Sequence, residues 1–332
     1  MILKLKAGNH ILNTAPRKPE YAALEPLKRV FGERIQFNVP LARYTAAQIG
    51  GPAMALLEVK TADELGLAAR TLWKMQVPWN VLGGGSNILV SDRGVQGVVL
   101  MNRARKVKFD ENAQPPTVWA ESGANLGLVA RLAAARGLSG LEWAAGIPGT
   151  IGGAVVGNAG AHGGDMSGNL LVAEILQQIS HSEEAKVERW AVKRLEYGYR
   201  TSLLKKKPGL AIVLAALLSL EQSTPAEVQA KIASFVEYRH RTQPPGASMG
   251  SMFKNPSGDY AGRLLEEAGL KGKQVGDAQI SDLHANFFIN LGQATAEDVF
   301  DLIQLAKNKV LDKFGVELEL EIELVGDWNY LN

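Results

Sequence analysis

Cysteine is absent from this chain of 332 residues. Its absence excludes disulfide bonds, thiolate-bound metals, iron–sulfur clusters and a cysteine nucleophile. Histidine is scarce as well, because the chain has five His residues and no pair of them has the H-x-x-x-H spacing. A dedicated zinc site normally needs several such ligands close together. The sequence therefore predicts no metal site.

An excess of charge of one sign is also missing. The 36 Lys and Arg residues nearly balance the 34 Asp and Glu residues, which leaves a formal net charge of +2. So small a charge gives no field that favours nucleic acid, and we expect no nucleic-acid partner. The longest apolar run, residues 210–220, is shorter than the roughly 20 residues that span a bilayer. Residues 1–6 lack the apolar core of a signal peptide, so we expect a cytoplasmic protein without membrane insertion.

Composition and residue pattern indicate a globular protein of mixed secondary structure. Hydrophobic residues make up 46% of the chain and charged residues 21%, as in ordinary soluble domains. Capping residues and helical spacing predict helices over 61–75, 124–136, 224–238 and 295–314. Apolar and alternating segments predict strands over 54–59, 79–83, 97–101, 117–121, 172–180, 211–220, 285–290 and 316–325. Because helices and strands do not alternate regularly, the predicted fold class is α+β.

Two glycine-rich segments are the most informative feature of the chain. Their candidate ligand-binding residues are Gly83, Gly84, Gly85, Ser86 and Asn87 in the first, and Gly146, Pro148, Gly149, Thr150, Gly152, Gly153, Asn158 and Ala159 in the second. Glycine lets backbone N–H groups approach a ligand without an intervening side chain. Successive N–H groups form a concavity that binds phosphate. Two such loops predict a dinucleotide cofactor, with Ser86, Asn87 and Asn158 as side-chain donors.

Two common nucleotide-binding motifs do not fit the first segment. No Lys follows Ser86 where a P-loop needs one to reach the terminal phosphates. Residues 88–90 have the pattern of a strand and not of a helix start, which disfavours a Rossmann unit. In an alternative interpretation the glycines only form tight turns. The presence of two segments with polar side chains favours the ligand site.

A series of motifs in unbroken order from residue 38 to residue 326 then points to one family. The motifs are the two glycine-rich segments, Arg43-Tyr44-Thr45, Tyr199-Arg200-Thr201-Ser202, Gly250-Ser251-Met252-Phe253-Lys254-Asn255-Pro256, residues 284–290 and residues 315–326. In this combination the chain resembles the UDP-N-acetylenolpyruvoylglucosamine reductases, flavoenzymes of bacterial peptidoglycan precursor synthesis.

The resemblance implies a vanillyl-alcohol-oxidase/p-cresol-methylhydroxylase-type FAD-binding domain in two lobes, followed by a C-terminal α+β substrate-binding domain. With a boundary at the predicted helix cap Thr224, we expect an N-terminal extension and helix over 1–37, lobes over roughly 38–110 and 111–222, and a substrate domain over 224–332. The resemblance also implies non-covalent FAD, NADPH as co-substrate and a nucleotide-sugar substrate, the enolpyruvyl ether of UDP-N-acetylglucosamine. We expect the chain to be a monomer.

Carried over position by position, the catalytic residues of the family fall on Arg200, Ser251 and Glu321. The implied cofactor site comprises both glycine-rich segments with Tyr44 and Thr45, and the implied substrate contacts are Tyr199, Lys254, Asn255 and Glu267. Two departures stand out. The stretch between Arg200 and Ser251 lacks the inserted loop whose Tyr covers the substrate in some members, so the chain resembles the shorter subclass. Glu267 stands where many members carry Gln.

The residue types suit the implied reaction to different degrees. An enol ether accepts hydride only if a cation stabilises the charge that develops on its carboxylate, and an Arg such as Arg200 matches a carboxylate with its fork. Ser251 is a weak acid in a Gly/Pro-rich loop, where a turn residue is the ordinary interpretation. The strict alternation over 316–324 would put Glu321 on a solvated acidic face of a strand, and only the resemblance selects it. His162 is expected to be a loop residue and not a flavin tether.

Two other functions remain open at this point. One is a sugar or lactone oxidase on the same fold, which would pass electrons from reduced flavin to oxygen and would need no nucleotide-sugar site. The other is a non-catalytic nucleotide-binding module, which would give a colourless preparation that FAD cannot reconstitute. The absorption spectrum of the pure protein separates the second of these from a flavoenzyme.

Overall fold

The computed structural model describes residues 24–178, 184–209 and 211–329. Most of the expected N-terminal extension, and residues 179–180 of one predicted strand, lie outside these ranges. Helices and sheets are mixed in the described part of the chain without a regular alternation. The predicted α+β class is confirmed.

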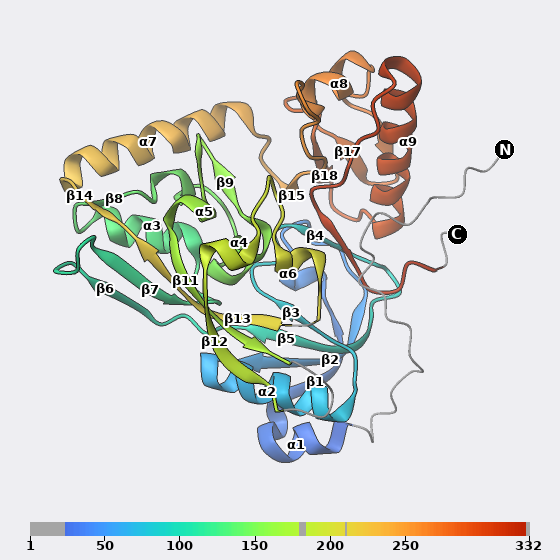
Figure 1. The fold of residues 1–332 in the computed structure, drawn as a ribbon. Coiled ribbons are helices and arrows are strands. Elements are labelled where there is room, and N and C mark those ends of the chain that lie inside the picture. The colour runs from blue at the N-terminus through green and yellow to red at the C-terminus, as the bar shows by residue number, and fades with distance from the viewer. Residues whose placement is uncertain (1–23, 179–183, 210, 330–332) are drawn as a thin grey trace.

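The first lobe contains a four-stranded sheet in the order β1-β2-β5-β3 (Figure 1). Its strands are β1 (Ile35–Pro40), β2 (Pro52–Val59), β3 (Trp79–Leu82) and β5 (Val95–Asn102), and β4 (Ile88–Val90) lies outside this sheet. The helices of this lobe are α1 (Glu25–Phe31) and α2 (Ala62–Met75). α2 begins after Thr61, whose side chain accepts the N–H of Glu64 as the capping prediction requires, and it shares a core with α1 and the sheet. β1 crosses residue 38, so this sheet also includes the end of the expected N-terminal segment.

The second lobe contains a five-stranded antiparallel sheet in the order β12-β11-β13-β7-β6. These strands are β6 (Val107–Asp110), β7 (Thr117–Glu121), β11 (Leu170–Gln177), β12 (Lys186–Ala191) and β13 (Ala211–Ser219). Its helices are α3 (Leu126–Ala134), α4 (Ile151–Gly157), α5 (Met166–Asn169) and α6 (Leu203–Lys206), and its short strands are β8 (Leu138–Ser139), β9 (Gly160–Ala161), β10 (Gly164–Asp165) and β14 (Glu221–Gln222). One core, which includes Trp143 and Trp190, joins the sheet to α3 and α4.

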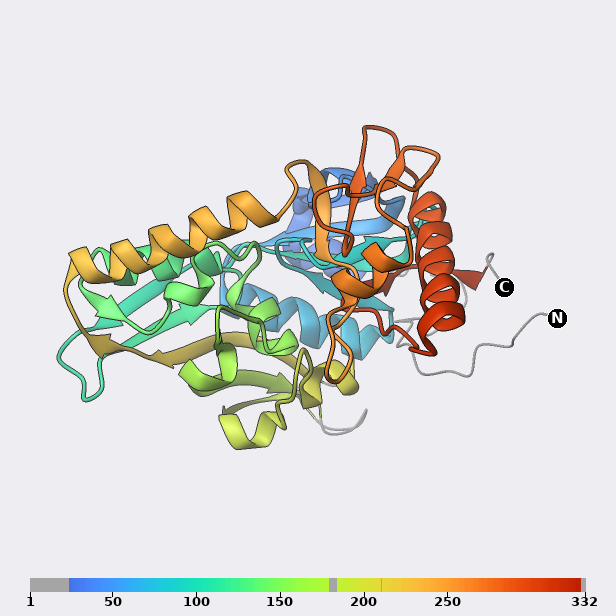
Figure 2. The same ribbon diagram turned by 90° about the horizontal axis from the view of Figure 1, so that it is seen from above.

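The long helix α7 (Pro225–Thr242) lies along the second lobe, as Figure 2 shows from above. It contacts α3, β8 and the short turn at residues 142–144, and Ile232 packs against the core of this lobe. The helix that follows the expected boundary at Thr224 therefore packs on the second lobe. The boundary itself stays a prediction.

The C-terminal part contains a four-stranded sheet in the order β15-β18-β17-β16 and two helices. These elements are β15 (Ala247–Ser251), β16 (Gln274–Val275), β17 (Ala278–Ile280), β18 (Phe287–Asn290), α8 (Ala261–Glu267) and α9 (Ala296–Phe314). α9 has the full capping box at its start, in which Thr295 and Asp298 each accept the other's main-chain N–H.

The chain then returns to the first lobe, where β19 (Glu323–Val325) pairs in parallel with β4. The predicted strand over 316–325 is wrong for most of its length, because only its last three residues form a named strand. Residues 319–323 change partners along this stretch: the Glu319 carbonyl accepts from Lys254, the Glu321 N–H donates to Met252, and the Glu323 N–H donates to Asn87. A segment that passes from one domain to another cannot complete a single ladder, even though its side chains alternate.

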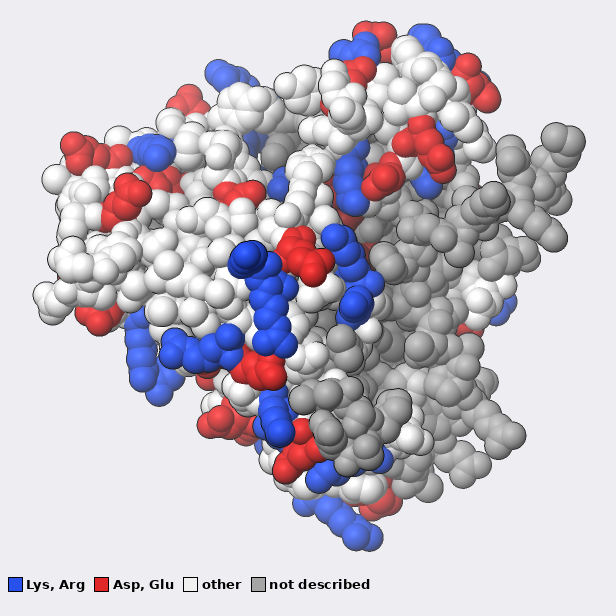
Figure 3. Space-filling view, in the orientation of Figure 1, with Lys and Arg blue, Asp and Glu red and all other residues white. Residues whose placement is uncertain are grey.

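The surface and the described side chains agree with a chain of balanced charge. On the face shown in Figure 3, Lys and Arg side chains are interspersed with Asp and Glu side chains.

Within the described ranges, no helix is long and apolar enough to cross a membrane. In the same ranges, no three His, Asp or Glu side chains are grouped so that they could hold a metal ion.

One carboxylate ties α9 to the first lobe. Asp92, which follows β4, accepts the N–H groups of Ala296 and Glu297 at 2.9 and 3.0 Å. These are orphan donors of the first turn of α9, and the helix dipole favours a negative charge there. Asn290 adds a second tie, because its side-chain amide donates to the Ala47 carbonyl at 2.9 Å.

We expect Asp92→Ala to lower the free energy of unfolding by about 1–2 kcal/mol, the usual cost of losing a helix cap. Asp301→Ala is the matched control, because Asp301 is an exposed acid on the same helix with no partner among the described residues. Thermal melts of both variants check this. A control that melts as low as Asp92→Ala would show that charge, and not the cap, matters.

Candidate active site

The two glycine-rich segments lie directly against each other. A Cβ on Gly83 would lie 2.5 Å from Thr150 Oγ1, and a Cβ on Gly84 would lie 2.9 Å from the Cα of Gly149. In addition, Ser86 Oγ donates to the Pro148 carbonyl at 3.1 Å. The structure thus brings together the two segments that we expected to hold one ligand. Their contact requires glycine, since side chains would push the loops apart.

The first segment presents main-chain N–H groups that no described residue of the protein accepts. In the described part of the chain, the N–H groups of Gly84, Gly85 and Ser86 have no acceptor, and Gly85 is buried with φ +61°. Buried N–H groups without an acceptor are rare unless a ligand or water binds them. Gly84 is exposed and Ser86 half-buried, and three successive N–H groups without a protein acceptor can form an anion-binding concavity.

A cavity of about 250 Å³ opens at this segment. Its lining includes Arg43, Tyr44, Thr45, Gly83, Gly84 and Arg103. Two guanidinium groups beside free N–H donors suit the diphosphate of a dinucleotide. The residues present therefore fit FAD at its diphosphate. Neither Arg was among the predicted site residues. Arg43 is part of the Arg43-Tyr44-Thr45 motif, whereas Arg103 follows β5 without a local signal.

The polar side chains of the glycine-rich segments bind other parts of the protein. Asn87 Nδ2 donates to the Glu321 carbonyl at 3.1 Å, and Asn158 Nδ2 donates to the Gly198 carbonyl at the same distance. The Thr45 hydroxyl is used within its own turn. These side chains hold the loops in place, which leaves main-chain N–H groups as the donors for a ligand. A direct role of the three residues in cofactor binding stays a prediction.

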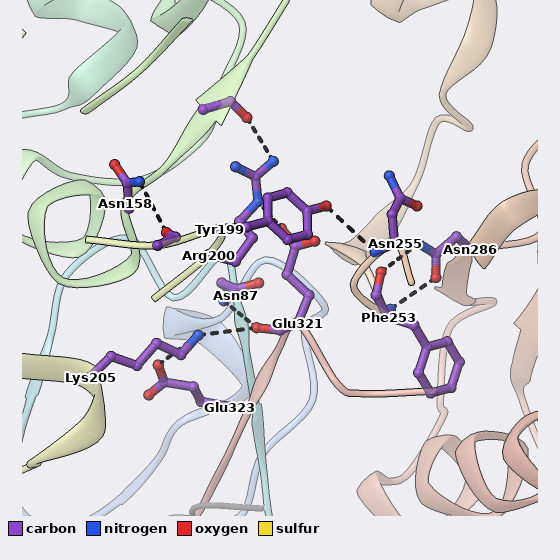
Figure 4. A network of polar contacts seen from close by, with 12 residues as sticks. Asn87, Asn158, Tyr199, Arg200, Lys205, Phe253, Asn255, Asn286, Glu321 and Glu323 are labelled. Atoms are coloured by element: carbon purple, nitrogen blue, oxygen red, sulfur yellow. Dashed lines mark hydrogen bonds and ion pairs between the residues drawn. The ribbon is translucent and has the colours of Figure 1, made fainter. Parts of the chain in front are cut away.

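An ion pair between Arg200 and Glu321 lies at the centre of the polar network in Figure 4. Arg200 Nε donates to Glu321 Oε1 at 2.7 Å, and Nη2 donates to the Gly160 carbonyl at 2.7 Å. Nη1 has no acceptor among the described residues. The two side chains are only 24% and 16% exposed. The backbone of Arg200 is left-handed, with φ +55°, and such conformations cluster at functional sites.

The main chain of Glu321 is fixed from three sides. Its N–H donates to the Met252 carbonyl at 2.9 Å, and its carbonyl accepts from Asn87 and, at 3.4 Å, from Lys205 Nζ. Lys205 also pairs with Glu323 at 3.4 Å (Figure 4). Sequence reasoning missed Lys205, although it follows the Tyr199–Ser202 motif closely.

The alternation over 316–324 would place four Glu residues on one solvated face, but the structure does not show such a face. Glu317 and Glu319 are exposed, whereas Glu321 is paired with Arg200 and Glu323 with Lys205. The prediction that Glu321 lies on a solvated face is therefore wrong, because the segment crosses between domains and turns this residue inward.

Ser251 ends β15, one residue before Met252, so the loop that carries it is held against Glu321. The Ser251 hydroxyl has no partner in the ranges that the structure describes. Asn286 fixes the same loop, because its amide donates to the Phe253 carbonyl at 2.8 Å and accepts the Phe253 N–H at 2.9 Å. Sequence reasoning had given Asn286 no role.

The expected substrate residues divide into two groups. Asn255 lies close to the ion pair, since its N–H donates to the Tyr199 hydroxyl at 3.5 Å, and the half-exposed Tyr199 ring lies 5.3 Å from the Arg200 guanidinium. Lys254 Nζ pairs with Glu319 at 3.1 Å. Glu267 is turned elsewhere: it pairs with Arg263 of its own helix at 2.6 Å and joins none of these contacts. Its role as a substrate contact stays a prediction.

Comparison with known proteins decides the family. The C-terminal domain of UDP-N-acetylenolpyruvoylglucosamine reductase matches residues 241–325, and the FAD binding domain matches residues 53–177. A reductase of this name from Chloroflexus aggregans is 43% identical over 292 residues, which cover 87% of this chain and 96% of the relative. The chain belongs to the UDP-N-acetylenolpyruvoylglucosamine reductase family.

Two further members support this assignment. The UDP-N-acetylenolpyruvoylglucosamine reductase of Bacillus subtilis is 40% identical over 305 residues, with 91% of this chain and 98% of the relative covered. The crystal structure of the reductase from Thermus caldophilus matches with a TM-score of 0.72 and 37% identity, over 88% of this chain and 98% of the other. The expected fold and the expected FAD cofactor of this reductase family are confirmed.

Gly84→Ala should weaken FAD binding by roughly 5- to 150-fold, for about 1–3 kcal/mol of overpacking, because its Cβ would press on Gly149 and push the two glycine-rich segments apart. Gly157→Ala is the control, since a Cβ there meets no atom within 4 Å. The ratio of flavin to protein absorbance in the purified variants measures retention. Full retention by Gly84→Ala would show that the contact between the loops is not needed for binding.

Proposed function

We propose that this chain reduces the enolpyruvyl ether of UDP-N-acetylglucosamine to UDP-N-acetylmuramate, with NADPH as the hydride donor, in peptidoglycan precursor synthesis. The observation that carries this proposal is the Arg200–Glu321 pair, held beside the glycine-rich cradle where the two lobes and the C-terminal part meet. The chemistry that FAD supplies when bound is hydride transfer between the two substrates. The N–H groups of residues 84–86, with Arg43 and Arg103, would hold its diphosphate.

Arg200 is the residue that we assign to the substrate carboxylate. Its Nε and Nη2 are already bound, to Glu321 and to the Gly160 carbonyl, so Nη1 is the donor that remains for a ligand. A guanidinium fixed in this way stabilises negative charge that develops on the carboxylate without having to reorganise. We assign Tyr199, Lys254, Asn255 and Glu267 to the nucleotide sugar.

Ser251 and Glu321 are the residues that we assign to proton transfer. The Ser251 hydroxyl is free to donate a proton to the α-carbon of the substrate, because no group of the described chain occupies it. Glu321 is close to this loop, because its main-chain N–H donates to the carbonyl of Met252, the residue after Ser251. Its carboxylate is fixed by Arg200. The hydrogen bond from Glu321 to Met252 and the bonds of Asn286 to Phe253 fix the positions of Ser251 and Glu321 relative to each other.

All the residues in these roles come from one chain, and we propose that the chain acts as a monomer. A nucleotide sugar and a reduced nicotinamide nucleotide are both supplied in the cytoplasm, where we propose that it works. Light scattering of the purified protein tests the first statement directly.

The function is tested by following flavin absorbance under anaerobic conditions. NADPH should bleach the bound flavin, the enolpyruvyl substrate should restore its colour, and UDP-N-acetylmuramate should appear in the mass spectrum. Rapid recovery with oxygen, but none with the nucleotide sugar, would contradict the proposal and favour an oxidase.

Arg200→Lys should slow the recovery of flavin colour by substrate roughly 10²-fold or more, the scale for losing a preorganised donor. Lysine keeps the charge but cannot bind Glu321, Gly160 and a carboxylate with a fixed fork. Arg194→Lys is the control, because Arg194 forms an exposed pair with Glu188. Stopped-flow traces of both variants check this. Equal, small effects would remove Arg200 from the proposed role.

Ser251→Ala should leave bleaching by NADPH near normal, since that step needs no proton from Ser251. Recovery with the enolpyruvyl substrate should slow by roughly 10²- to 10⁴-fold, the scale for losing a positioned acid. Ser251→Cys should keep part of the rate, because a thiol can also donate a proton.

Ser248→Ala, on the same strand, is the matched control for this change. Stopped-flow absorbance measures the two steps separately. If both steps slow equally in Ser251→Ala, or if recovery stays near normal, Ser251 is not the proton donor.

A further inference from the structure

Arg239, in the last turns of α7, is a half-buried cation that no group of the described residues pairs with. In the described ranges its guanidinium makes no hydrogen bond or ion pair. Burial lowers its pKa, and no carboxylate opposes this effect. A desolvated and unpaired charge is costly, so a cation in this position calls for an anionic partner from outside the chain.

The side chain of Arg239 runs across the second glycine-rich segment. A Cβ on Gly146 would lie 2.7 Å from Arg239 Cδ and 3.1 Å from its Nε. The missing side chain of Gly146 makes room for this Arg, and the expected contact of Gly146 with the cofactor stays a prediction. The guanidinium is thereby held at the segment that continues to Pro148 and Gly149.

The groups around Arg239 cannot neutralise it. The His162 ring stacks on Phe235 of α7, with centroids 4.1 Å apart and planes 2° from parallel, and Tyr238 meets it edge-on at 5.8 Å. Burial, followed by the charge of Arg239, lowers the pKa of His162 and so favours its neutral form. His162 is therefore a packing residue of the hairpin between β9 and β10.

A second Arg at the same segment shows the contrast. Arg131, on α3, donates from Nη1 to the Ala145 carbonyl at 2.9 Å. Its hydrogen bond is made within the protein and explains its position. Arg239 lies beside the next residue, Gly146, and has no such bond.

We propose that Arg239 binds a phosphate group of a nucleotide cofactor at the second glycine-rich segment, with the FAD diphosphate as the expected source. Guanidinium and phosphate form short, charge-assisted hydrogen bonds, often two in parallel. Arg239 crosses the second glycine-rich segment, and this segment contacts Gly83 and Gly84 of the first glycine-rich segment. α7 would thus close over the cofactor from the side opposite the first lobe. This inference rests on the FAD-dependent function proposed above.

The test is a titration of FAD into protein from which the flavin has been removed. Arg239→Met should raise the Kd for FAD by roughly 10- to 100-fold, as expected for the loss of a hydrogen bond to a charged group. Arg241→Met is the matched control, because it removes the same charge from an exposed position two residues away. Arg239→Lys should recover part of the affinity. The thermal stability of the flavin-free Arg239→Met protein should not fall, since no protein partner is lost.

A separate titration distinguishes the two sources of phosphate. In protein saturated with FAD, a rise in the KM for NADPH but not for NADH, with the Kd for FAD unchanged, would assign the phosphate to the co-substrate. Unchanged FAD affinity together with unchanged NADPH and NADH constants would overturn the proposal. Because the FAD titration needs no nucleotide sugar, it gives the same answer whether or not the proposed reductase activity is found.

Discussion

The hydrogen bonds at Glu321 are the constraint on which the arrangement of the site depends. The N–H of this residue is bound by Met252 of the C-terminal part, its carbonyl by Asn87 of the first lobe and Lys205 of the second, and its carboxylate by Arg200. The first lobe, the second lobe and the C-terminal part thus all contact Glu321. A shift of either lobe or of the C-terminal part would move the acid relative to the cofactor cradle, and a displacement of about 1 Å can cost a catalytic site much of its rate.

A partly buried ion pair such as Arg200–Glu321 is not an efficient way to gain stability. Removing two charges from water costs several kcal/mol for each ion, and their attraction often only balances this. The Arg200–Glu321 pair is better explained by its geometry, since it leaves Nη1 of the guanidinium without an acceptor among the described residues. Stability comes instead from the apolar cores and from ties such as Asp92, which fix the domains at little cost in desolvation.

Close approach of a neighbouring group explains several of the glycines at the site. Gly84 lies against Gly149, and Gly146 lies beneath Arg239. From the sequence alone, both glycines are equally good candidates for contact with a phosphate. The structure separates them, because one makes room for the opposite loop and the other makes room for a side chain.

Local signals in the sequence were enough to predict the long helices. Thr61 and Thr295 cap α2 and α9 through groups only three residues away, and such contacts need no knowledge of the rest of the fold. The two glycine-rich segments were visible directly in the sequence, and the motifs identified the family and, through it, Arg200 and Glu321. The strand expected over 316–325 failed because a strand requires one continuous partner, and this segment changes partners between domains. Lys205, Arg103 and Arg239 could be recognised only in the tertiary structure, since what distinguishes each of them is a neighbour that lies far away in the sequence.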